Sequence, residues 1–115
     1  MHQSTKEEFC KLLAEIQDEI YAIAVSKGWW ANTRNKGELI ALMHSELSEA
    51  LEGLRHNNPP SDKIPTFSAV EEELADTIIR ILDMAAAYGL RIGPAILAKM
   101  EFNQTREYKH GGKSF

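Results

Sequence analysis

Apolar residues recur three and four positions apart along most of the chain, the spacing that aligns them on one face of an α-helix. Four such series are separated by short stretches that lack this period. The pattern therefore predicts four helices, at about residues 5–27, 36–56, 69–88 and 94–107.

Residues that favour helix ends stand at the borders of these series. Three positions carry an N-cap residue that is followed three residues later by a glutamate, namely Ser4, Asn35 and Ser68. Gly28 and Gly89 are placed to end the first and third helices. Residues 57–65 contain three prolines, which predicts an exposed loop between the second and third helices.

Strand-like alternation of apolar and polar residues is absent from the sequence, which favours an all-α fold. A chain of 115 residues is long enough for one domain with a modest core. We therefore expect a four-helix, bundle-like domain over residues 1–115. The second and third helices carry more apolar surface than such a chain would cover alone, which favours a dimer or higher oligomer.

Composition and charge narrow the choice of compartment and partner. The net charge of −4 gives no general attraction to nucleic acid polymers or to anionic membranes. The only cysteine, Cys10, lies among apolar residues and is assigned a packing role. Neither a signal peptide nor a run of about 18 apolar residues occurs, so we expect a cytoplasmic protein.

Two short acidic pairs stand inside otherwise apolar helices, Glu46 with Glu49 and Glu73 with Asp76. The i, i+3 spacing places both carboxylates of a pair on one helix face, about one turn apart. Either pair alone is more commonly a solvated surface feature. Glu46, however, falls in the apolar stripe of its helix, where an unpaired carboxylate is costly. The two pairs together predict a site for Mg²⁺, with Mn²⁺ as an alternative ion.

The register of the third helix is ambiguous, because Glu72 directly precedes Glu73 and could replace or supplement it as a ligand. We assign the role to Glu73. A di-iron carboxylate bundle would need a Glu-x-x-His motif on each of two helices, and the sequence contains none.

Positive and amide side chains near the C-terminus could form the other half of a phosphate site. They are Lys99, Asn103, Arg106, Lys109 and Lys113. Taken alone, such a tail is more often frayed and solvated. Trp29 and Trp30 are large aromatic groups in the loop after the first helix. A nucleobase could stack on one of them, and we assign this role to Trp30.

In order along the chain, Glu46, Glu49, a gap of 23 residues, Glu73 and Asp76 resemble a known signature. It is the E-x-x-E … E-x-x-D signature of the MazG-like, all-α nucleoside triphosphate pyrophosphohydrolases. The resemblance covers most of the chain and includes residues 28–30, 35–38 and 42–50, the series Lys99, Asn103 and Arg106, and residues 109–113.

The resemblance implies hydrolysis of an NTP or dNTP to the monophosphate and pyrophosphate, with Mg²⁺ held by Glu46, Glu49, Glu73 and Asp76. It also implies assembly as a homodimer or homotetramer. Glu49 is our choice for the general base, with Glu46 as a second catalytic carboxylate, and the basic residues near the C-terminus would hold phosphate oxygens. Base and sugar preference stay open. Two alternatives also stay open, a related phosphoribosyl-ATP pyrophosphatase and a non-catalytic helical interaction module.

Overall fold

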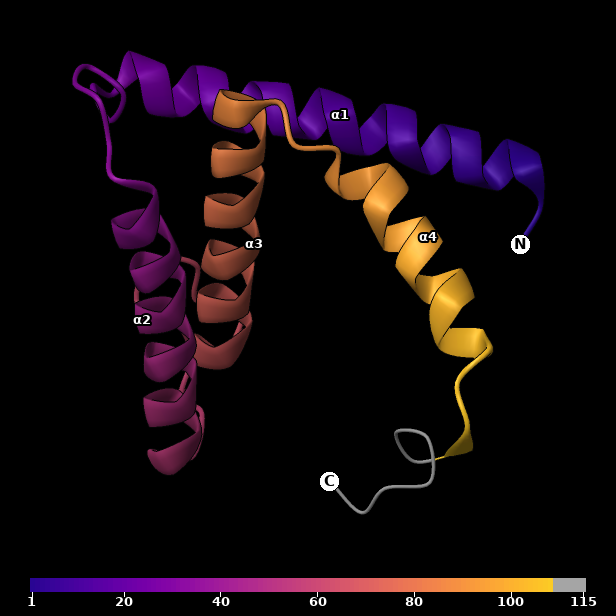
Figure 1. Ribbon diagram of the computed structural model, residues 1–115. Helices are drawn as coiled ribbons and strands as arrows, with labels where there is room; N and C mark the ends of the chain where they lie inside the picture. The colour runs from indigo at the N-terminus through magenta and orange to yellow at the C-terminus, as the bar shows by residue number, and fades with distance from the viewer. Residues whose placement is uncertain (109–115) are drawn as a thin grey trace. The chain divides into compact units, whose positions relative to one another are not determined.

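The computed structural model describes residues 1–108 and is all-α, as predicted (Figure 1). The helices are α1 (Gln3–Ser26), α2 (Lys36–Arg55), α3 (Ala69–Tyr88) and α4 (Ile92–Gln104). In those residues the only strand-type pairing is an isolated bridge between Pro60 and Ser68. The prediction of four helices is confirmed, although α4 starts two residues earlier and ends three residues earlier than expected.

Local hydrogen bonds account for most of the helix borders. The Asn35 side chain accepts from the Glu38 backbone N–H at 3.0 Å, and Ser68 and Glu71 form a reciprocal capping box. Hydrogen bonds from Ser68, first from its backbone N–H and then from its hydroxyl, lower the pKa of Glu71. Gly89 ends α3 in the left-handed conformation, with a φ of 66°.

The predicted cap at Ser4 is wrong, because α1 already begins at Gln3. The carbonyl of His2 accepts from the backbone N–H groups of Thr5 and Lys6, both at 3.1 Å. Ser4 therefore lies inside the first turn. Glu7, its supposed partner, instead accepts a hydrogen bond from the Gln3 side chain at 3.3 Å, an i, i+4 contact along the helix surface.

The chain divides into two compact units. The larger unit is Gln17–Leu90, and the smaller unit combines Met1–Ile16 with the chain from Arg91 onward. The single domain expected over residues 1–115 stays a prediction.

In the smaller unit, the start of α4 approaches the first half of α1 closely. Gly93 is buried, and a Cβ atom at this position would lie 3.4 Å from Leu13 Cδ2 and 3.5 Å from Cys10 Cα. A Cβ atom at position 93 would thus already be in van der Waals contact with both residues. Cys10 is half-buried at this contact, as expected for a packing residue.

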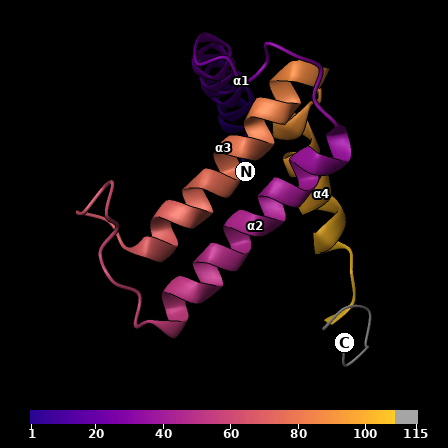
Figure 2. The ribbon, with the colours of Figure 1, turned by 90° about the vertical axis from the view of Figure 1, so that its left-hand side faces the viewer.

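In the larger unit, α2 and α3 lie side by side as a helical hairpin (Figure 2). The most buried apolar side chains are Leu39 and Ala50 of α2 with Leu82 and Ala85 of α3. Near the hairpin bend, a Cβ atom at Gly53 would lie 3.4 Å from that of Ala69. Small residues thus let the two backbones approach each other closely.

The loop between α2 and α3 is held in place by hydrogen bonds, although the sequence predicts only an exposed connection. Asn58 adopts a positive φ of 48°, and its side chain accepts from the Val70 N–H at 3.0 Å. The Pro59 carbonyl accepts from the Ala69 N–H at 2.7 Å. Ser61 is 3% exposed and donates its hydroxyl to Glu72. The loop is therefore a fixed part of the larger unit.

Apolar side chains on α2 and α3 remain partly uncovered. Between 45% and 57% of each residue is exposed at Leu47, Leu51, Leu54, Leu74 and Ile78. This surface agrees with the expected self-association, which stays a prediction. Of the helices in residues 1–108, none by itself has the length and apolar character to cross a membrane. The helices α3 and α4 reach those values only when counted together as a bent pair.

The capping box at the start of α3 should contribute measurably to stability. We expect Ser68→Ala to lower the free energy of unfolding by about 1 kcal/mol, because the N–H of Glu71 loses its acceptor. Urea denaturation followed by circular dichroism measures the change. Ser48→Ala is the control, since Ser48 lies within α2 and bonds only the His44 carbonyl one turn earlier. Equal stabilities of the two variants would contradict the prediction.

Candidate functional site

Packing of α2 against α3 brings three carboxylates together. Glu46 of α2 and Glu73 and Asp76 of α3 each offer an oxygen, and these oxygens all lie within 4.8 Å of one another. All three residues are half-buried. We call Glu46, Glu73 and Asp76 the acidic cluster.

The charges of the acidic cluster are poorly balanced. A hydrogen bond between the Glu73 and Glu46 carboxyl groups, together with burial and nearby negative charge, raises the pKa of Glu73 to about 7. Burial, followed by the charges of Glu46 and Glu72, also raises the pKa of Asp76. A divalent cation would supply the positive charge that favours the ionised carboxylates. Carboxylate oxygens are also the hard ligands that Mg²⁺ prefers. The donor set therefore fits the ion that the sequence predicts.

The structure distinguishes Glu72 from Glu73. Glu72 accepts the hydroxyl of Ser61, and its other oxygen lies 3.9 Å from the ammonium of Lys63. Glu73 instead faces Glu46. The geometry thus favours Glu73 as the cluster member and gives Glu72 the role of anchoring the loop.

Glu49 lies at the same pocket but apart from the three converging oxygens. Its side chain is exposed, and it lines a pocket with a volume of about 450 Å³. The apolar wall of this pocket comes from the last turns of α1, at Ile20, Ile23 and Ala24. We call this space the acidic pocket. Glu49 is thus a fourth carboxylate at this pocket that does not belong to the acidic cluster.

Basic side chains surround the acidic pocket, and the sequence analysis assigned none of them to the site. They are Lys27, Arg34, Lys63 and Arg80. Arg80 is the most closely engaged, since its Nε donates to Glu46 Oε1 at 3.0 Å. The signal was present in the sequence, because Arg80 follows Asp76 by four residues and so shares its helix face.

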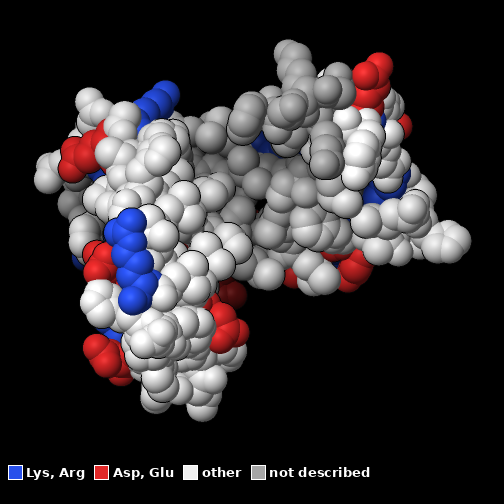
Figure 3. All heavy atoms as spheres, turned by 90° about the horizontal axis from the view of Figure 1, so that it is seen from below, with Lys and Arg blue, Asp and Glu red and all other residues white. Residues whose placement is uncertain are grey.

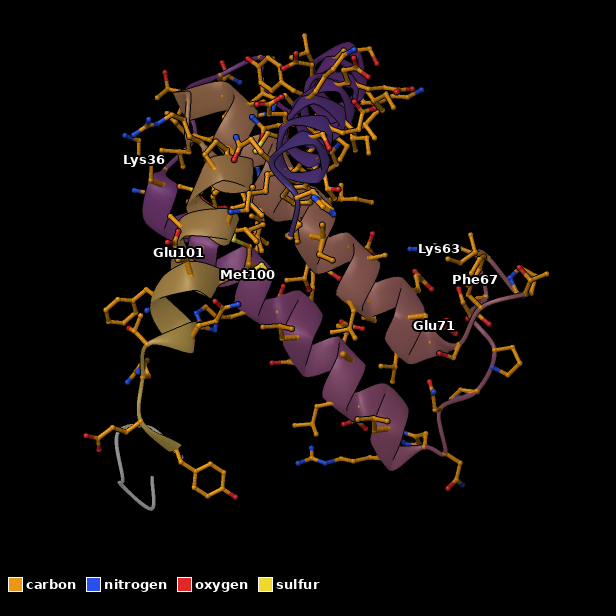
Figure 4. The ribbon with its side chains drawn as sticks, turned by 90° about the vertical axis from the view of Figure 1, so that its right-hand side faces the viewer. Lys36, Lys63, Phe67, Glu71, Met100 and Glu101 are labelled. Carbon is orange, nitrogen blue, oxygen red and sulfur yellow. The ribbon has the colours of Figure 1, made fainter. Side chains whose placement is uncertain are left out.

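Two views show how these charges are distributed. Figure 4 shows Lys63 extending from the loop toward α3, whereas Glu71 lies at the start of that helix. In the face drawn in Figure 3, acidic and basic side chains are scattered among uncharged ones, and some acidic groups adjoin basic ones.

Trp30 does not line the acidic pocket. Its indole N–H donates to both carboxylate oxygens of Asp83, at 3.0 and 3.1 Å, and its ring packs against Tyr21 and Tyr88. It lines a second hollow instead. The neighbouring Trp29, which is 64% exposed, lines the acidic pocket. The geometry thus favours Trp29 over Trp30 as a residue that a ligand could contact.

Asp83 forms a separate polar contact on α3. Burial raises its pKa, whereas the hydrogen bond from Trp30 and the charge of Arg34 oppose that rise. The Arg34 guanidinium lies 4.0 Å from an Asp83 oxygen and stacks 4.9 Å from the centre of the Trp30 ring. This arrangement fixes the loop after α1 against α3.

The expected phosphate-binding residues near the C-terminus belong to the smaller unit. Lys99 and Arg106 lie 4.6 and 5.9 Å from the centre of the Phe102 ring, and Asn103 is exposed on α4. Lys109 and Lys113 fall outside the described residues. The roles of all five stay predictions.

Comparisons with family models, with curated proteins and with solved structures found no match for this chain. The site is therefore interpreted from its own geometry and from the resemblance seen in the sequence.

The raised pKa of Glu73 predicts a pH-dependent stability in the metal-free protein. An unfolded glutamate loses its proton near pH 4.5, whereas folded Glu73 retains it to about pH 7. Across this window the folded state binds more protons, so stability should fall as the pH rises. After allowance for solvent screening we expect a loss on the order of 1 kcal/mol from this residue.

Urea denaturation in a chelator at several pH values tests this expectation. Glu73→Gln should remove the loss and become more stable than the wild type at pH 7.5. Glu52→Gln is the matched control, because Glu52 is an exposed residue of α2 outside the acidic pocket. Parallel pH curves for the wild type and Glu73→Gln would contradict the assignment.

Proposed function

We propose that this chain is a Mg²⁺-dependent nucleoside triphosphate pyrophosphohydrolase that cleaves an NTP or dNTP to the monophosphate and pyrophosphate. The observation that carries the proposal is the convergence of Glu46, Glu73 and Asp76 at one pocket. The ordered E-x-x-E … E-x-x-D resemblance also supports the proposal. It rests on the sequence alone, and its signature contains the same three residues.

The acidic cluster would hold the metal, with Glu49 as an additional carboxylate at its edge. When bound, Mg²⁺ would offset the negative charge of a triphosphate and make a water molecule easier to deprotonate. Mn²⁺ has similar oxygen preferences and is the alternative ion. Either ion would also relieve the repulsion among the three carboxylates.

Glu49 would act as the general base, a role supported by its position at the pocket but outside the converging oxygens. It would take the proton of a water molecule as the water oxygen forms a bond to the α-phosphorus. The bond from the α-phosphorus to the bridging oxygen then breaks, and the electron pair leaves with pyrophosphate. Glu46, the second catalytic carboxylate, would help to orient the reacting groups.

The substrate's charge also needs donors from the protein. Lys63 and Lys27 line the acidic pocket and are exposed, so they are available to phosphate oxygens. Lys99, Asn103, Arg106, Lys109 and Lys113 are further candidates that rest on the resemblance alone. Trp29, with the Arg34 guanidinium 6.0 Å from its ring centre, offers a flat surface to a base.

The exposed apolar residues of α2 and α3 favour self-association as part of the same proposal. A homodimer or homotetramer would cover side chains that are about half exposed in the single chain. The same surface would also suit a non-catalytic interaction module. Catalysis separates the two readings, because only the enzyme should depend on the acidic cluster and on metal.

A broad panel of NTPs and dNTPs tests the activity. Purified protein with Mg²⁺ should release pyrophosphate, and not inorganic phosphate, from at least one nucleotide, and chelation should abolish the release. Glu49→Gln and Asp76→Asn should each lower kcat by at least about 10²-fold, because the base or a metal ligand is lost.

Glu52→Gln is the control, since Glu52 lies one turn beyond Glu49 on α2 and does not line the pocket. Its activity should equal that of the wild type, and circular dichroism should confirm that all variants are folded. The enzyme proposal is refuted by a lack of turnover across the panel, or by turnover that survives both site substitutions.

A further inference from the structure

Arg80 is a basic residue in direct contact with the acidic cluster. It follows Asp76 by four residues on α3, and its Nε donates across the hairpin to Glu46 Oε1 at 3.0 Å. The Glu46 side chain is 15% exposed, whereas that of Arg80 is 38% exposed and lines the acidic pocket. Both ends of the ion pair line the pocket, and the Arg80 end is the more accessible to solvent.

The guanidinium uses only part of its donor capacity. Arginine carries five N–H donors, and in residues 1–108 the Nε contact with Glu46 is the only hydrogen bond of Arg80 to another side chain. The two terminal amino groups, with four N–H donors, therefore remain for water or a ligand. Their fork geometry matches the oxygens of a phosphate group.

The formal charges make this pair dependent on what else is bound. Three carboxylates and one guanidinium carry a formal net charge of −2, which is the charge that one divalent cation neutralises. A cation held by Glu46 would weaken the attraction between Glu46 and Arg80 and would itself repel the guanidinium. Arg80 and the metal therefore compete for the same carboxylate.

We propose that Arg80 is the resident counter-ion of the acidic cluster and turns from Glu46 to a phosphate oxygen of the substrate once a divalent cation is bound. Without metal, the guanidinium limits the repulsion among the carboxylates and keeps Glu46 oriented toward the pocket. With metal and nucleotide, the same group binds the charge that the nucleotide brings. This inference rests on the proposed function, because it assigns a substrate contact to that site.

The proposal predicts opposite effects of one substitution on metal and on substrate. Arg80→Met removes a competing cation, so Mn²⁺ alone, titrated without nucleotide, should bind about threefold to tenfold more tightly than to the wild type. The loss of a phosphate donor should lower kcat/KM for the nucleotide by about 10²-fold. Electron paramagnetic resonance of free Mn²⁺ measures the first quantity and pyrophosphate release the second.

Two further variants make the comparison sharp. Arg80→Lys keeps the charge but not the fork, so its Mn²⁺ affinity should stay near that of the wild type while kcat/KM recovers only in part. This variant also decides the question if Arg80→Met fails to fold. Arg55→Met is the control, because Arg55 pairs with Glu52 on the exposed surface of α2 away from the pocket. It should change neither quantity.

The outcomes separate this inference from the function on which it rests. Tighter Mn²⁺ binding together with a lower kcat/KM supports the proposal. A purely structural ion pair would weaken both, and a solvated surface pair would change neither, and either result overturns it. So does tighter metal binding with unchanged kcat/KM. If the wild type binds Mn²⁺ but hydrolyses no nucleotide, the proposed function fails and the phosphate contact fails with it.

Discussion

Close packing of α2 against α3 holds three carboxylates together despite their mutual repulsion. This constraint explains much of the polar structure of the larger unit. The hairpin of α2 and α3 is close near its bend, where a Cβ atom at Gly53 would lie 3.4 Å from that of Ala69. Leu39 of α2 and Leu82 of α3 are among the most buried apolar residues of this unit, and their burial favours the folded state. The carboxylates lie close together in the folded unit, and the hydrogen bond with Glu46, burial and the neighbouring negative charges together raise the pKa of Glu73.

The surrounding polar contacts can be understood as responses to this negative charge. Arg80 offsets Glu46 within the hairpin, while Glu72, which is not a member of the cluster, contacts Ser61 and Lys63. The second contact has a structural consequence, because Ser61 is the buried anchor of the loop between α2 and α3. The position of Lys63 at the acidic pocket thus follows from the same glutamate that fixes the loop.

The parts of this structure that local chemistry determines could be predicted from the sequence. Asn35, Ser68 and Gly89 act through neighbours within five residues, so the borders of α2 and α3 followed from their spacing. Adjacent residues posed the harder problem, because one step along a helix turns a side chain by about 100°. The choice between Glu72 and Glu73 depends on how α3 is rotated against α2. The choice between Trp29 and Trp30 depends on Asp83, which accepts a hydrogen bond from the Trp30 indole although it lies 53 residues away in the sequence.

The alternating charges on α3 could also be explained by a series of purely structural ion pairs. A comparison of Asp83 with the acidic cluster argues against this explanation. Asp83 shows a satisfied carboxylate of this kind, since the Trp30 indole and the Arg34 guanidinium both oppose the pKa rise that burial causes. About two to three turns earlier on α3, Glu73 and Asp76 meet Glu46 of α2, and within residues 1–108 this group of three carboxylates has one guanidinium in direct contact, that of Arg80. A purely structural series would balance both places equally. Asp83 and Arg34 line the same pocket, so the excess of negative charge is local to Glu46, Glu73 and Asp76, where a cation and an anionic substrate could bind together.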